Sequence, residues 1–172
     1  MGKGLEQILT QKKSVIAKYW FDLTAQTYAP DTAEFIKNNK DQFANPVGGA
    51  MLNSLNGLLD QLINSMDPQA VTLHLDAIIR IRAVQNFTPS QAIAFILSLK
   101  KVLRENLTKE LRDSRIASEL VTFETKIDRL CLMAFDIYMQ CREKIFQIRA
   151  NETRNRTFKA FARAGLVSEA PE

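Results

Sequence analysis

The sequence is poor in the residues from which many metal and phosphate sites are built. Its 172 residues include one histidine, two cysteines and six glycines. A metal site made from histidine and cysteine brings three or four such ligands to one point, so we expect no metal site. Glycine-rich phosphate loops, of either the Walker or the dinucleotide type, are absent as well. No residues resemble a nucleophile elbow, and we therefore expect neither an enzyme nor a cofactor.

The two cysteines, Cys131 and Cys141, lie ten positions apart in one predicted helix. That spacing separates them by about 15 Å along the helix axis, which is beyond the reach of a disulfide. The N-terminus does not resemble a signal peptide, so both are expected to be cytosolic thiols. No apolar stretch approaches the roughly 20 residues of a membrane span. The sequence thus favours a cytoplasmic protein.

What the chain does contain is a globular composition with repeated signals for helix starts. Apolar residues make up 46% and charged residues 24%, close to the average of soluble domains. The pairs Asn45-Pro46, Asp67-Pro68 and Thr88-Pro89 each place a capping residue before a proline, which suits the first helical position. Strand-like alternation is absent. We predict an all-α fold, a single helical bundle with a long C-terminal helix.

Apolar periodicity predicts five helices before the last one. They are expected at Leu5–Tyr28, Thr32–Asn38, Pro46–Ser65, Pro68–Gln85 and from Pro89 to about Leu111. Phe43 is expected to anchor the polar connection after the second helix to the core. The helix from Pro68 is apolar on two faces, which is typical of a central, buried helix. A break is expected between Leu111 and Ser118.

The last helix is predicted to run from about Ile116 to Ala164, roughly 70 Å at 1.5 Å per residue. Its apolar positions alternate spacings of four and three, as in a heptad repeat. These positions are Ile116, Leu120, Phe123, Ile127, Leu130, Ala134, Ile137 and Cys141, followed by Ile145 and Ile148. A compact domain of this size has a radius of gyration of about 16 Å, so the helix end should project. We divide the chain into a helical domain, 1–148, and a basic extension with its tail, 149–172.

The projecting end is strongly basic. Residues 142–163 hold seven lysines or arginines against two glutamates. This stretch could be a solvated helix face, or it could meet an acidic protein, an anionic membrane surface or nucleic acid. Aromatic residues among the cations favour a protein docking surface or dimer contact over nucleic acid. The candidate docking residues are Arg149, Arg154, Arg156, Phe158, Lys159, Phe161 and Arg163.

The single histidine, His74, belongs to the helix expected at Pro68–Gln85. Arg82 lies two turns further along its face, while Asp76 and Arg80 are spaced for an ion pair. One interpretation is a hydrogen-bonded core histidine beside a structural charge network. The others are a polar lining of a small-ligand pocket formed by these four residues, and a haem ligand.

Four parts of the sequence resemble one protein family. Ile79–Phe87, with the letters IRIRAVQNF, and the following Pro89–Ala92 resemble the N-terminal domain of RsbRD-type proteins, the RsbT co-antagonists of the bacterial stressosome. The segment Phe43–Gly48 and the combination of Trp20 with Tyr-Ala-Pro at 28–30 resemble upstream motifs of that family. The stretch Ala150–Phe158 is similar to the end of stand-alone members.

The resemblance implies a sensory input unit for bacterial stress signalling. Related stressosome input domains are globin-like dimers without haem, and their signal leaves through a helix at the C-terminus. In this sequence no STAS output domain follows, because it ends at Glu172. The resemblance thus implies a stand-alone homodimer that passes its signal through the last helix to an unknown signalling protein. The alternative function is that of a haem-binding or small-ligand-binding protein that uses a pocket near His74.

Overall fold

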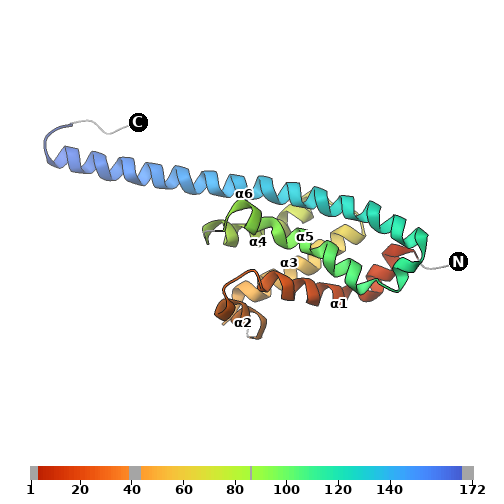
Figure 1. Cartoon of the computed structure of the whole chain (residues 1–172). Helices are drawn as coiled ribbons and strands as arrows, with labels where there is room; N and C mark the ends of the chain where they lie inside the picture. Colours follow the sequence, from red (N-terminus) through yellow and green to blue (C-terminus); the bar gives the residue numbers. More distant parts are fainter. Residues whose placement is uncertain (1–3, 39–43, 86, 168–172) are drawn as a thin grey trace.

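The computed structural model describes residues 4–38, 44–85 and 87–167 (Figure 1). These residues form six α-helices and one short 3-10 helix, and they contain no strand. The helices are α1 (Leu5–Ala25), α2 (Pro30–Asn38), α3 (Pro46–Ile63), α4 (Pro68–Val84), α5 (Pro89–Asn106), η1 (Glu110–Arg112) and α6 (Ser114–Arg163). The predicted all-α bundle with a long C-terminal helix is confirmed.

The three helices that follow a capping residue and a proline begin where the sequence predicts. The side chains of Asn45 and Asp67 accept hydrogen bonds from backbone N–H groups in the first turns of α3 and α4. Thr88 accepts from the N–H of Gln91, and the Gln91 side chain accepts from the N–H of Thr88, which completes a capping box. Each cap satisfies donors that a helix start otherwise leaves unpaired.

Other boundaries differ by a few residues from the prediction. The first helix ends at Ala25 instead of Tyr28, and Pro30 begins α2 instead of only ending α1. The break before the last helix covers residues 107–113, earlier than predicted, because Asp113 caps α6 by accepting from the N–H of Arg115 at 2.8 Å. Phe43, the expected anchor, lies outside the described residues.

Five helices form a closed ring around one core. α6 packs against α4 and α5, α4 packs against α3, α5 packs against α1, and α1 packs against α3. The short α2 contacts α1 and α3 at one end of the bundle (Figure 1). Within the core the indole N–H of Trp20 donates to the Phe95 carbonyl at 2.7 Å and so joins α1 to α5.

The expectation that the helix from Pro68 is central and buried on most sides is wrong. In α4 one face is buried, but Leu73 is 70% and Val84 66% exposed on the other. The reason is the arrangement of the helices in a ring. In this ring α4 packs mainly between α3 and α6, so it buries only the face that points to the shared core. The second apolar face of α4 is therefore part of the surface.

The last helix is 50 residues long, as its periodicity predicts. Its predicted seam is buried from Ile116 to Ile137, and Tyr138 is buried beside it. Beyond that point α6 leaves the other helices and projects alone (Figure 1), and Ile148 is 51% exposed. Gly165, with a φ of 70°, ends the helix, a conformation that glycine adopts without strain.

Candidate functional site: the buried Arg82 and the exit of α6

The most unusual group in the core is a fully buried arginine. Arg82, near the end of α4, is 0% exposed. Its Nη2 donates to the Thr24 carbonyl at 3.3 Å, in the last turn of α1, and to Thr27 Oγ1 at 2.9 Å, in the turn that follows α1. Its Nη1 donates to the Gln91 carbonyl at 3.2 Å in the first turn of α5. One guanidinium therefore joins α4 to two other helices.

Three aromatic rings enclose this guanidinium. The Arg82 Cζ lies 5.1 Å from the ring centroid of Tyr28, 5.0 Å from that of Phe87 and 4.9 Å from that of Phe95. We call Arg82, Thr27 and these three rings the Arg82 cage. Such cation–π contacts stabilise a desolvated cation. Burial lowers the pKa of Arg82, and it raises the pKa of Tyr28.

Two polar atoms of the Arg82 cage have no hydrogen-bond partner in the structure: Arg82 Nε and the Tyr28 hydroxyl. Beside the cage is a cleft of about 290 Å³, lined by Thr27, Gln85, Phe87, Gln91 and Ala94. Buried polar groups are normally paired. Both atoms are buried and neither Arg82 nor Tyr28 lines the cleft, so the contact between cage and cleft is made by Thr27 and Phe87.

The junction between α4 and α5 also holds α6 where that helix leaves the body. The Tyr138 hydroxyl donates to the Phe87 carbonyl at 2.5 Å, and Arg142 Nη1 donates to the Ala83 carbonyl at 2.9 Å. Ala83 follows Arg82 directly, and Phe87 is a wall of the Arg82 cage. The last buried turn of α6 is thus hydrogen-bonded to the segments that form the cage.

The structure separates the other predicted pocket residues from Arg82. The His74 imidazole lies against Gly57 of α3, so close that a Cβ added at Gly57 would overlap the ring. Asp76 and Arg80 form an ion pair at 2.5 Å in which the Arg80 side chain is 64% exposed. The hydrogen bond to Asp76 raises the pKa of Arg80. In the described part of the chain, no hydrogen bond or ion pair joins these residues to Arg82, and the ligand pocket stays a prediction.

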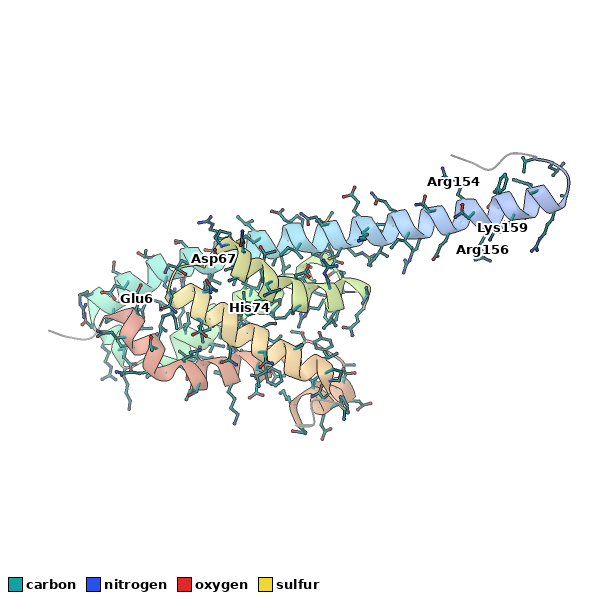
Figure 2. All side chains as sticks on the ribbon, turned by 180° about the vertical axis from the view of Figure 1, so that it is seen from behind. Glu6, Asp67, His74, Arg154, Arg156 and Lys159 are labelled. Atoms are coloured by element: carbon teal, nitrogen blue, oxygen red, sulfur yellow. The ribbon has the colours of Figure 1, made fainter. Side chains whose placement is uncertain are left out.

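The predicted docking residues lie on the projecting part of α6, with Arg154, Arg156 and Lys159 labelled in Figure 2. All are exposed except Phe158, which is partly buried. At 100° per residue, Arg149, Arg156, Lys159 and Arg163 share one side of the helix. We call these four residues the basic face; Arg154 and Phe161 lie on the opposite side. The structure places no other helix against this segment (Figures 1 and 2).

Two further kinds of site have no candidate among the described residues. No three histidine, cysteine, aspartate or glutamate side chains are grouped so that they could hold a metal ion. Nor is any described helix both long enough and apolar enough to cross a membrane.

A packed ring of helices with one long projecting helix and a buried polar centre at its exit defines a class of small all-α modules. Comparison with known families then identifies the chain more closely. Residues 15–153 match the model of the RsbT co-antagonist protein rsbRD N-terminal domain. The chain belongs to this family, which confirms the predicted resemblance and marks it as a signalling-related helical domain.

An individual relative adds little about function. An uncharacterized protein of Archaeoglobus fulgidus is 30% identical over 98 residues, which cover 55% of this chain and 61% of that protein. The match therefore spans about three-fifths of the relative's length. No solved structure matches the chain.

Proposed function

We propose that this protein is a non-enzymatic signalling module, a sensor or adaptor that passes a change in its helical body through α6 to a protein partner. The observation that carries the proposal is the pair of hydrogen bonds from Tyr138 and Arg142 to the carbonyls of Phe87 and Ala83. Membership of the RsbRD N-terminal family supports a role in stress signalling. In keeping with the sequence, we place the module in the cytoplasm.

The physical basis is that α6 is continuous from the core to its free end. A change in the Arg82 cage that moves the Phe87 carbonyl also moves the hydroxyl of Tyr138 bonded to it. Since α6 is helical without interruption to Arg163, its projecting part follows that movement as a rigid rod. Small shifts of packed elements are amplified in this way in many protein switches.

The basic face of the projecting helix is the surface that would meet the partner. Arg149, Arg156, Lys159 and Arg163 form a field of one sign, which attracts acidic surfaces and accelerates encounter at low salt. An acidic protein partner therefore fits this face better than an apolar one. The second part of the proposal is that the module acts as a homodimer.

Binding of a partner can be tested by affinity capture with the full chain. We expect a bound protein set that is lost in the variant R149Q/R156Q/R163Q and weakened as the salt concentration rises. The matched control is K18Q/K109Q/R112Q, which removes three exposed cations from the body and should keep the set. Equal capture by both variants would contradict a role for the basic face.

A second candidate function is favoured by the cleft of about 290 Å³ beside the Arg82 cage, whose lining includes Thr27, Gln85 and Gln91. The hydroxyl and amide groups of these residues suit a small anion such as acetate or inorganic phosphate. The expected result is that one of these anions raises the melting temperature of the wild type more than that of Gln85→Ala. Equal shifts in both proteins would contradict binding of the anion in this cleft.

The haem alternative from the sequence is tested separately. Haem added to the wild type and to His74→Ala should give different absorption spectra if His74 is an axial ligand. Identical spectra exclude His74 from that role.

A further inference from the structure

A groove lies between α1, α2 and α3, at the end of the bundle where α2 lies across from α6 (Figure 1). Its volume is about 590 Å³, which is within the range of small-molecule sites. The residues that α1 and α3 contribute are three or four positions apart, so one stripe of each helix faces the groove. We call it the α1–α3 groove.

The floor of the α1–α3 groove is apolar. Ala17 and Phe21 of α1 and Ile36 of α2 line it, and each of them is at most 8% exposed. On the opposite side α3 presents Gly48 and Leu52. An apolar group that enters the groove is therefore removed from water against buried carbon atoms, which is favourable.

Three charged side chains line the groove above this floor. They are Lys18 and Asp22 on α1, which are one helical turn apart, and Lys37 on α2. Lys18 is exposed, and the other two are partly buried. Within the described parts of the chain none of the three side chains forms a hydrogen bond or an ion pair. The rim of the groove thus carries two unpaired ammonium groups against one carboxylate.

The composition of α3 explains why these ammonium groups have no partner. Lys13 forms an ion pair with Asp60 at 2.5 Å, so a lysine of α1 reaches a carboxylate of α3 where the sequence supplies one. Along the groove α3 supplies the amides of Asn53 and Asn56 and no acidic residue. The excess positive charge of the rim is therefore complementary to an anionic group from outside the chain.

We infer that the α1–α3 groove binds a small carboxylate with an apolar body, of the class of medium-chain aliphatic acids. The carboxylate lies at the ammonium groups of Lys18 and Lys37. The apolar body lies on the floor that Ala17, Phe21 and Ile36 form. This inference goes beyond the proposed function, because binding in the groove does not depend on transmission through α6.

The groove is placed where a ligand acts on the Arg82 cage. Phe21 belongs to the floor, and three residues later the carbonyl of Thr24 accepts the hydrogen bond from Arg82 Nη2. A ligand that packs against Phe21 therefore contacts α1 about one turn before the residue that holds Arg82. In a sensor of the proposed kind, this is the point at which a ligand enters the path to α6.

Titration of the full chain with octanoate, followed by NMR of its backbone amides, tests the binding. Octanoate should shift the signals of Ala17–Asp22 and Gly48–Asn53, with a dissociation constant on the order of 1 mM or lower. Hexanoate should bind about tenfold more weakly, because it buries two CH₂ groups fewer. If about 10 mM octanoate shifts neither segment, no site of useful affinity is present and the inference is overturned.

The charge of the ligand is tested with octanoate, octanol and octylamine, which share one chain length. Octanoate should bind most tightly and octylamine most weakly. Lys18→Gln/Lys37→Gln should weaken octanoate about fivefold and leave octanol unchanged, whereas Asp22→Asn should strengthen octanoate about twofold. The control Lys109→Gln/Lys144→Gln removes the same charge outside the groove and should have no effect. Octanol or octylamine that binds as tightly as octanoate contradicts a carboxylate ligand.

Matched variants locate the site. Ser14 lines the groove from an exposed position, so Ser14→Leu fills part of it without entering the core and should weaken octanoate at least fivefold. Thr10→Leu, at an exposed position of α1 outside the groove, should bind like the wild type. Unchanged binding by Ser14→Leu, or loss of binding in Gln85→Ala of the cleft beside the Arg82 cage, overturns the inference. The titration needs no partner, so its failure is distinguishable from failure of capture by the basic face.

Discussion

Arg82 holds a positive charge in the core with carbonyl oxygens, one hydroxyl and three aromatic rings as its partners. An isolated buried cation would cost many kcal/mol, but hydrogen bonds to a charged group contribute about 1.5–3 kcal/mol each. The rings contribute on the order of 2 kcal/mol where the cation is desolvated. The planar guanidinium can reach acceptors on α1 and α5 at the same time, which a lysine cannot do.

The substitution Arg82→Lys should therefore lower the free energy of unfolding by roughly 3 kcal/mol, since it leaves buried acceptors and a buried charge without their partners. Chemical denaturation measures this change. Arg80→Lys on the same helix is the matched control and should leave the transition unchanged, because its side chain is 64% exposed. Similar effects of the two substitutions would show that Arg82 is not an essential part of the core.

Gly57 and His74 form a second pair whose coupling can be measured. An alanine in a helix is normally about 1 kcal/mol more stable than a glycine, but a Cβ at Gly57 would overlap the His74 ring. In the His74→Ala background, Gly57→Ala should thus give that full gain, while in the wild type the gain should be much smaller or absent. A double-mutant cycle by denaturation gives the interaction energy. An additive cycle would contradict the contact.

At this scale the sequence revealed the unusual residues but not their neighbours. Arg82 and His74 can be recognised as unusual in the sequence, because each is a polar residue on an apolar helix face. Thr24 is 58 positions from Arg82, and Phe87 is 51 positions from Tyr138. No local pattern connects such residues, because their contact depends on how whole helices pack. The Arg82 cage and the role of Tyr138 therefore became visible only in the structure.

At the scale of helices, the sequence correctly predicts those features that depend on residues close together in the chain. The starts of α3, α4 and α5 follow from a capping side chain and a proline within a few residues of each other. The length of α6 follows from the apolar spacing that continues to Ile148 and from the glycine at 165, which ends the helix. The burial of α4 was predicted wrongly, because burial depends on how many neighbours surround a helix and not on its own apolar content.

The capping box of α5 gives a quantitative expectation. Thr88→Ala removes the acceptor for the Gln91 N–H and should lower the free energy of unfolding by about 1 kcal/mol. Thr88→Ser keeps a hydroxyl at the same position and should restore most of the loss. Thermal unfolding followed by circular dichroism distinguishes the variants. If alanine were as stable as serine at this position, the cap would not contribute to α5.

At the scale of the whole molecule, α6 has two roles on one continuous helix. Its first half closes the ring of helices, held to α5 by the bidentate pair Arg104–Glu124 at 2.8 Å. Its second half projects with the basic face exposed. The Arg82 cage and the last buried turn of α6 share the α4–α5 junction, and the proposed function uses this junction as the route from the body to the projecting half.

Hydrogen exchange read by mass spectrometry tests this coupling most directly. Thr27→Val removes the hydroxyl that accepts from Arg82 Nη2 and disturbs the cage without touching α6. We expect faster exchange around Ala83–Phe87 and also in residues 138–148 of α6, whereas the exposed control Thr10→Val on α1 should change neither region. Faster exchange confined to α1, α4 and α5, with residues 138–148 as protected as in the wild type, would contradict transmission through α6.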